Sequence, residues 1–267
     1  MQLAAARLLL TAVLLVGVVA LARRVRQMTD SWRQPPTWWA GVGQVGFNLC
    51  FLGAVDRVGV AVGTLVAIGA TPVLTGLVTR QVSRAWLLAT ATAVCGLVLL
   101  VGGQARSESV PSAWGILLAL GASASYATYI IAGNAAAVRR QPIQPFLAGA
   151  FAVSAVLTVP LLFTGDVTWV GTGSGALLVA YLAVVPTVVA YSLFNRGLQG
   201  IRPSTASTLG LLEPVVAAGL AVLVVGERLS PLGAGGALLV IVGLLMIVRT
   251  ARDSSARVAV GENAVRA

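Results

Sequence analysis

The residues most able to do chemistry in this chain are a carboxylate and a proline inside an apolar run near its end, Glu213 and Pro214. The rest of the run 210–223 is Gly, Leu, Val and Ala. Inserting a carboxylate near the middle of a membrane costs about 3 kcal/mol of free energy. Such residues are therefore rare, and each one marks a candidate functional site. Proline lacks a backbone donor and loosens a helix. Glu213 is therefore our first candidate for taking up a proton or contacting an amine. The alternative is a structural carboxylate that pairs with an arginine or caps a helix.

Other polar residues of the apolar runs recur at spacings of three or four, which places them on common helical faces. They form three groups: Gln44 with Asn48; Tyr126 with Tyr129; and Thr187 with Tyr191 and Asn195. A polar central cavity would collect these side chains. The alternative is that each one bonds a neighbouring helix and holds a bundle together.

Two absences narrow the chemistry further. The chain has no histidine, which excludes Ser-His-Asp hydrolysis and His-ligated zinc or haem. It has no lysine, which excludes a Walker A loop and a pyridoxal Schiff base. The cysteines Cys50 and Cys95 lie in apolar runs and are expected to be buried small residues, not a disulfide or a metal pair. We therefore expect no enzyme activity, no cofactor and no metal.

The composition shows where these residues must lie. Apolar residues make up 58% of the chain and charged residues 10%, and the mean hydropathy is +0.93. Soluble domains carry about 25% charged residues. The sequence therefore predicts an integral membrane protein whose main partner is the lipid bilayer. The net charge of +10 would suggest nucleic acid in a soluble protein, but the arginines gather at the ends of apolar runs, so no nucleic-acid partner is expected.

Membrane-spanning helices need about 20 mostly apolar residues, with tolerance down to about 17. No segment alternates like the strands of a membrane barrel, so the spans are predicted to be helical. The sequence predicts an all-α polytopic bundle of about nine helices: Leu3–Ala22, Thr37–Val55, Val58–Thr79, Ala85–Gly103, Ala113–Gly133, Gln144–Phe163, Gly175–Asn195, Thr205–Val225 and Pro231–Val248. The glycines of Gly59-x-x-x-Gly63 predict a site of close helix packing.

The arginines predict the orientation through the positive-inside rule. The connections after the odd-numbered spans hold Arg23, Arg24, Arg26, Arg33, Arg80, Arg84, Arg139, Arg140, Arg196 and Arg202, whereas those after the even-numbered spans hold Arg57, Arg106 and Arg228. The tail adds further arginines, so we expect a multi-pass cell-membrane protein with a cytoplasmic C-terminus and an external N-terminus. An external start would be eased by one more helix upstream. Arg7 would then lie near an external helix junction, where its long side chain can reach water.

The chain also contains an internal sequence repeat. Residues 70–77 parallel residues 212–220, with Pro72 matching Pro214, and a polar break and a Gly/Leu-rich helix follow each. This pattern predicts a first repeat of four helices over 1–103, a second of five helices over 112–249, and a disordered cytoplasmic tail over 250–267. Because five is odd, the two repeats would insert in opposite orientations, which is the architecture of many secondary transporters. We expect Pro72 and Pro214 to kink their helices.

These residues resemble a known family. Leu212-Glu213-Pro214-Val215, then Gly226-Glu227-Arg228-Leu229-Ser230 and a glycine-rich final helix, resemble the closing signature of EamA-type transporters of the drug/metabolite transporter superfamily. The segment from Trp114 to Tyr129 resembles the helix that opens that family's second repeat. The resemblance covers nearly the whole chain and implies ten helices in two inverted repeats, of which the first helix is absent here. The Gly-Glu-Arg motif is also absent from the first half, where Arg80 and Gln81 stand near its place.

The resemblance implies proton-linked or facilitated movement of small organic metabolites or drugs, often as export. The candidate residues for substrate binding or coupling are Glu213, Tyr126, Tyr129, Tyr191, Asn48 and Gln44. The alternative function is a non-transporting membrane scaffold or subunit, since an incomplete first repeat leaves open whether a pathway closes. The sequence defines neither the substrate nor the oligomeric state.

Overall fold

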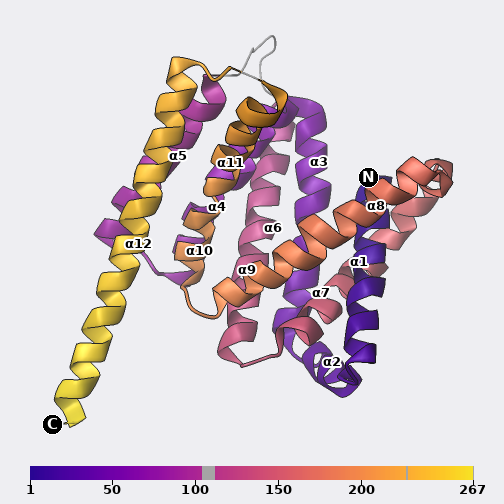
Figure 1. Ribbon diagram of the computed structural model, residues 1–267, viewed down its shortest axis with the longest axis horizontal. Helices are drawn as coiled ribbons and strands as arrows, with labels where there is room; N and C mark the ends of the chain where they lie inside the picture. Colours follow the sequence, from indigo (N-terminus) through magenta and orange to yellow (C-terminus); the bar gives the residue numbers. More distant parts are fainter. Residues whose placement is uncertain (104–111, 227, 267) are drawn as a thin grey trace. The chain divides into compact units, whose positions relative to one another are not determined.

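The computed structural model describes residues 1–103, 112–226 and 228–266, with the backbone alone for Val225 and residues 251–266 (Figure 1). Every regular element in this part of the chain is a helix. The predicted all-α class is therefore confirmed, and its cause is that a helix satisfies its own backbone hydrogen bonds in a medium without water. Arg106 and Glu227 lie outside the described residues.

Eight helical runs among the described residues are long and apolar enough to cross a membrane. They are Gln2–Leu21, Pro35–Thr79, Arg84–Gly102, Ala113–Val138, Ile143–Phe163, Gly173–Leu198, Pro203–Val224 and Pro231–Thr250. The run Pro35–Thr79 has 45 residues and includes two of the nine predicted spans. A straight helix of that length would measure about 68 Å, more than twice the hydrocarbon core of a bilayer.

A reversal inside helix α3 (Pro35–Gly69) resolves this excess length. Gly59 has φ +76°, in the left-handed region that favours glycine. A Cβ placed on Gly63 would lie 3.4 Å from Cγ2 of Val55. Residues eight apart on one straight helix are separated by about 12 Å, so the chain turns back between these two. Each of the nine predicted spans thus falls within one of the eight runs to within one residue. The packing role expected for Gly59 is wrong: a Cβ placed on it would meet no heavy atom within 4 Å, and it makes the turn.

The chain divides into two compact units. Unit 1 comprises Met1–Gly53 and Ala124–Arg202, and unit 2 comprises Ala54–Ser123 and Pro203–Ala267. Each unit takes segments from both predicted repeats, because α3 and α6 (Ala113–Val138) each contribute to both units. The repeat assignment over 1–103 and 112–249 stays a prediction.

Unit 1 is built around large buried side chains. Besides the first part of α3 and the second part of α6, it contains α1 (Gln2–Leu21), α2 (Val25–Trp32), α7 (Ile143–Thr158), the short helices η1 (Val159–Phe163) and η2 (Thr168–Gly171), α8 (Gly173–Ala183), the π-helix η3 (Val184–Val189) and α9 (Ala190–Leu198). Its core joins Leu8 and Leu15 of α1 to Tyr129 of α6 and to Phe146 and Phe151 of α7.

Unit 2 brings helix backbones together through small residues. It contains α4 (Thr71–Thr79), α5 (Arg84–Gly102), α10 (Pro203–Leu209), α11 (Leu212–Leu220), the π-helix η4 (Ala221–Val225) and α12 (Pro231–Arg266). Helices α5 and α12 run side by side (Figure 1). A Cβ on Gly96 would lie 2.5 Å from the backbone nitrogen of Val240, and one on Gly243 would lie 2.7 Å from the carbonyl oxygen of Ala89. Such close approach of helices is typical of membrane proteins.

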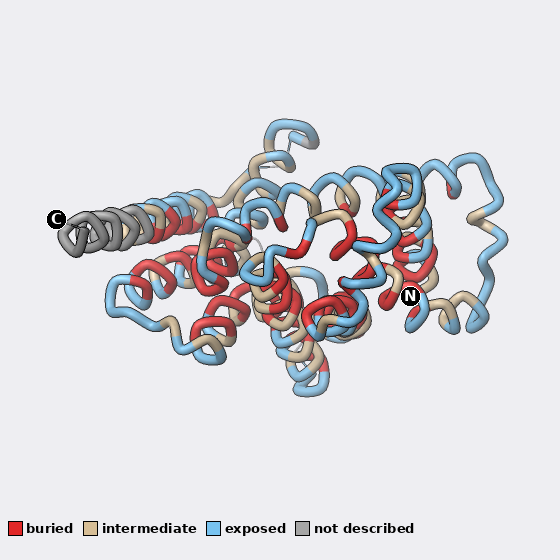
Figure 2. The backbone as a smooth tube through the Cα atoms, turned by 90° about the horizontal axis from the view of Figure 1, so that it is seen from below, coloured by how far each residue is buried: buried red, intermediate tan, exposed pale blue. Residues whose placement is uncertain are grey.

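Exposed stretches alternate with buried ones along the helices (Figure 2), and many of the exposed side chains are large and apolar. Leu21, Phe163 and Leu223 are each more than four-fifths exposed. In water such a surface would be costly, but lipid tails solvate it. Helix α12 continues to Arg266, beyond its apolar run, and disorder of the tail stays a prediction.

Candidate functional site

Five of the six candidate residues lie in unit 1, where they form a group that we call the unit 1 polar cluster. Its members are Arg7 of α1, Gln44 and Asn48 of α3, Tyr126 and Tyr129 of α6, and Tyr191 and Asn195 of α9. Gln44, Asn48, Tyr129 and Asn195 are buried, and the other three are half-buried. Arg7 and Asn195 were not among the predicted site residues.

Helix α9 joins the cluster through Tyr191. Its hydroxyl donates a hydrogen bond to Oε1 of Gln44, at 3.0 Å. Its ring meets the rings of Tyr129 and Phe151 edge-on, with centroids 5.2 and 5.3 Å apart. These T-shaped contacts are favourable because the positive edge of one ring faces the negative face of another. They also fix the direction of the Tyr191 hydroxyl.

Asn195, one turn further along α9, holds Tyr129. Its Nδ2 donates to the hydroxyl of Tyr129 at 2.7 Å and to the carbonyl oxygen of Tyr191 at 2.9 Å. Tyr129 is only 1% exposed, so an unpaired hydroxyl there would be costly. The expected common face of Thr187, Tyr191 and Asn195 begins in η3. There Pro186 lacks a backbone N–H, and the hydroxyl of Thr187 donates to the carbonyl oxygen of Leu182, five residues back.

Glycines let α6 approach α3 closely enough to place the tyrosines. A Cβ on Gly43 would lie 2.7 Å from the carbonyl oxygen of Ser125, and one on Gly46 would lie 2.5 Å from the Ser125 hydroxyl. Tyr126 then packs its ring against Phe47, with centroids 5.4 Å apart. Phe47 stacks in turn on Phe51 of the same helix, also at 5.4 Å. Tyr126 is thus bordered by an aromatic strip of α3.

Arg7 takes a different position from the one expected. Its Nη2 donates to Oδ1 of Asn48 at 2.7 Å, and Nδ2 of Asn48 donates to the carbonyl oxygen of Gln44 at 2.7 Å. The Nε–H of Arg7 is buried and has no hydrogen-bond partner among the residues that the structure describes. Arg7 points inward because its neighbours on the same helical face, Ala4 and Thr11, are themselves buried.

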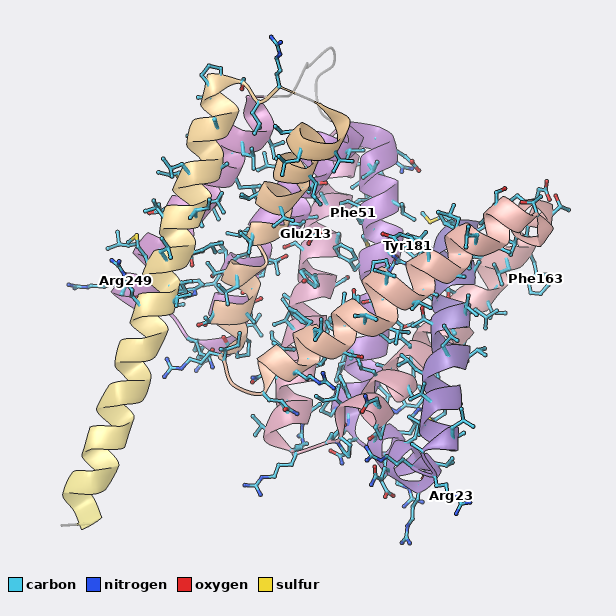
Figure 3. The ribbon with its side chains drawn as sticks, viewed as in Figure 1. Arg23, Phe51, Phe163, Tyr181, Glu213 and Arg249 are labelled. Carbon is cyan, nitrogen blue, oxygen red and sulfur yellow. The ribbon has the colours of Figure 1, made fainter. Side chains whose placement is uncertain are left out.

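Glu213 belongs to unit 2 and lies in the first turn of α11 (Figure 3). The preceding helix α10 ends at Leu209, so the helix is interrupted inside a membrane-length run just before Glu213 and Pro214. Glu213 is exposed, and no described side chain forms a hydrogen bond or ion pair with it. Neither an arginine partner nor a capping role is therefore observed for this carboxylate within the described part of the chain.

The run containing Pro72 is interrupted in the same way. Helix α3 ends at Gly69, and α4 begins at Thr71 with Pro72 in its first turn. Proline is tolerated there because the first backbone N–H groups of a helix have no intrahelical partner. Both proline positions therefore coincide with the start of a new helix inside a spanning run. Kinking by the prolines themselves stays a prediction.

No group of three His, Cys, Asp or Glu residues suited to a metal occurs in the searched, described part of the chain. Cys50 and Cys95 are free thiols. Cys95 is exposed, so the expectation that it is buried is wrong, because it lies on a face of α5 that no other described helix covers.

Comparison with known proteins then identifies the family of the chain. Its residues 113–249 match the EamA-like transporter family. A Bacillus subtilis (strain 168) protein named uncharacterized transporter YwfM is 36% identical over 222 residues, which are 81% of this chain and 74% of YwfM. The chain belongs to the EamA-like transporter family. The resemblance found in the sequence is therefore confirmed, and this EamA-like transporter is a multi-pass membrane protein that moves small metabolites.

Two further comparisons agree. The threonine/homoserine exporter RhtA of Escherichia coli (strain K12) is 30% identical over 201 residues, which are 74% of this chain and 65% of RhtA. A crystal structure that is 23% identical gives a TM-score of 0.77 and covers 94% of this chain and 88% of its own. At that identity the similarity supports the fold of this EamA-like transporter but says nothing about its function.

Proposed function

We propose that this EamA-like transporter is a secondary exporter of small organic metabolites or drugs that works by alternating access with proton coupling. We place its C-terminus in the cytoplasm and its first residue outside. Glu213 and the unit 1 polar cluster, which includes Gln44, Asn48, Tyr126, Tyr129 and Tyr191, supply the coupling and binding groups. The exporter name of RhtA supports the direction of transport.

The observation that carries this proposal is the interruption of two spanning runs, before Pro72 and before Glu213 with Pro214. Discontinuous helices are typical of secondary transporters, whose half-helix N-termini and unwound backbone form the substrate and ion sites. The positive end of the α11 dipole also favours a carboxylate in its first turn. A carboxylate without a described partner is suited to take up and release a proton during each cycle.

Three arginines with left-handed backbone conformation stand where helices end: Arg23 (φ 56°), Arg80 (φ 54°) and Arg140 (φ 55°). They close α1, α4 and α6, and their guanidinium groups complement the negative ends of these helices. All three lie in connections that the positive-inside rule assigns to the cytoplasm.

Inverted membrane vesicles, whose cytoplasmic face points outward, test the proposal. With an acid interior, the wild type should accumulate a labelled solute from a panel of amino acids, amines and drugs that includes L-threonine and L-homoserine. Glu213→Gln should equilibrate that solute without accumulating it, because the neutral amide carries no proton. Glu213→Asp is the matched control that keeps an acid.

Three outcomes count against parts of this proposal. Absence of flux for the whole panel contradicts transport and favours the scaffold alternative. Wild-type accumulation by Glu213→Gln removes this residue from coupling. External protease that leaves the C-terminal tail intact in these vesicles contradicts the orientation.

A further inference from the structure

Arg7 is a cation inside a membrane-length helix whose described hydrogen-bond partner is neutral. It is the sixth residue of α1, about 8 Å along the axis from the first. Ionisable residues at such positions are rare, and they pair with one another or mark a substrate pathway. The described carboxylates of unit 1 are Asp30 and Asp166, and neither forms an ion pair with Arg7. Asp166 accepts from the Thr168 backbone at 2.8 Å, and hydrogen bonds from the Thr168 side chain and backbone lower its pKa.

The guanidinium group keeps most of its binding capacity. Arginine has five N–H donors, and hydrogen bonds to described residues account for one, the 2.7 Å bond from Nη2 to Asn48. The Nε–H is buried and unpaired. A buried donor without a partner costs about 1–3 kcal/mol, and more when the group is charged. Arg7 is therefore set up for an acceptor that the described part of the protein does not supply.

The part of α3 that holds Asn48, the partner of Arg7, also carries aromatic side chains that suit the body of an organic ligand. Asn48 holds the guanidinium in one orientation, and its own Nδ2 is engaged with Gln44. Phe51 lies three residues from Asn48 on the same face of α3, stacked on Phe47, which contacts Tyr126. Aromatic faces accept either apolar groups or an ammonium group.

We infer that Arg7 binds the carboxylate of the transported solute, so that this transporter selects organic acids or zwitterions. Arginine suits this role because its planar fork matches a carboxylate bidentately. The inference rests on the proposed transport function and adds a substrate class to it. A lipid phosphate offers the same chemistry to the guanidinium, and the experiment separates the two sources.

The test uses the purified full-length protein in nanodiscs and measures its thermal stability with matched ligand pairs. L-Threonine with L-threoninamide, L-homoserine with its amide, and lactate with lactamide differ only in the carboxylate. A ligand that binds the native state raises the melting temperature. At least one carboxylate should shift it, and its amide should not. Arg7→Gln should weaken that binding by at least about tenfold, the usual effect of losing a charged hydrogen bond.

Asn48→Asp keeps the test decisive if Arg7→Gln fails to fold. The new carboxylate would stand 2.7 Å from Nη2 of Arg7 and compete with the ligand from within. This variant should fold, because its ion pair with Arg7 offsets the lost hydrogen bond from Asn48 to the carbonyl oxygen of Gln44, and it should lose carboxylate binding. Arg24→Gln, at the exposed end of α1, is the control that should bind like wild type.

Several outcomes overturn the inference. One is a set of bound or transported solutes that lack a carboxylate, which leaves the proposed transport function intact. Another is unchanged carboxylate affinity in Arg7→Gln or Asn48→Asp. A third is a melting temperature that responds to phosphatidylglycerol in place of phosphatidylcholine in wild type but not in Arg7→Gln, since this assigns Arg7 to lipid phosphate. Absence of flux for every solute in the vesicle assay contradicts the transport function itself.

Discussion

Glycines bring helices together in both units, but unit 1 also has a core of large aromatic side chains, whereas α5 and α12 of unit 2 meet across glycine and alanine. In unit 1, Tyr129, Phe146 and Phe151 are almost fully buried. In unit 2, the backbones of α5 and α12 approach each other at Gly96 and Gly243. Even the buried Trp86 of unit 2 fits because its ring lies against Gly76, which has no side chain.

The side-chain hydrogen bonds between helices involve different groups in the two units. In unit 1, Tyr191 and Asn195 bond side chains more than 60 residues away in the sequence, on other helices. In unit 2, the bonds between helices mostly involve small hydroxyl groups, as between Thr71 and Ser123 or Thr90 and Thr208, both 3.1 Å apart. Unit 1 thus gathers amide and phenol groups in one cluster, whereas unit 2 supplies closely packed helices and the interrupted runs.

The comparison predicts that unit 1 should be damaged by smaller side chains. Tyr129→Ala removes a ring that is 1% exposed, and should lower the free energy of unfolding by about 3 kcal/mol. This value is at the lower end of the usual cost of replacing a buried aromatic side chain by alanine, because side chains of the unfolded state in a bilayer still avoid water. Unfolding in a denaturing detergent measures the effect. Tyr181→Ala, on an exposed position of α8 (Figure 3), is the matched control. Equal losses for the two variants would refute the assignment of Tyr129 to a packed core.

Unit 2 should be damaged by larger side chains. Gly236→Ala places a Cβ against the backbone nitrogen of Leu100 and should cost about 1–3 kcal/mol through overpacking. A Cβ on the adjacent Gly235 would meet no heavy atom within 4 Å, so Gly235→Ala should be neutral or stabilise the protein by up to about 1 kcal/mol through helix propensity. Thermal unfolding of both variants in detergent makes the comparison. A stabilising Gly236→Ala would show that the α5–α12 contact is looser than described.

The smallest effect should come from a hydroxyl group alone. Tyr129→Phe keeps the ring and removes the 2.7 Å bond from Asn195, which retains its bond to the carbonyl of Tyr191. We expect a loss of about 0.6 kcal/mol, the average for a side-chain hydrogen bond in a membrane bundle. The same unfolding assay measures it. A loss as large as that of Tyr129→Ala would mean that the hydroxyl, not the ring, stabilises unit 1.

Much of this architecture could be predicted from the sequence because a bilayer sets the length of each span. The apolar runs predicted all nine spans, and the Glu213-Pro214 signature predicted the family. The shared faces of Gln44 with Asn48 and of Tyr191 with Asn195 followed from helical spacing. The repeats, the orientation and the roles of the site residues stay predictions.

Other features depend on contacts that no single helix specifies. The partner of Tyr191 is 147 residues away in the sequence, and one-dimensional periodicity does not identify it. Gly59 fits a packing motif as well as a turn, and only its φ distinguishes the two. Arg7 was placed at a water-exposed junction because its distance from the helix end allowed that, but the burial of its neighbours on α1 directs it to Asn48.

The division of the chain has a consequence for biosynthesis. Unit 1 ends at Arg202 but begins at Met1, and unit 2 takes its first segment, Ala54–Ser123, from within that interval. The helices that are synthesised first therefore enter the membrane before the later helices of the same unit, with which they pack, have been made. Unit 1 can close only after α9 is inserted, and unit 2 only after α12. The early helices must persist in lipid with few of their final contacts, which requires spans that are apolar enough to insert one at a time.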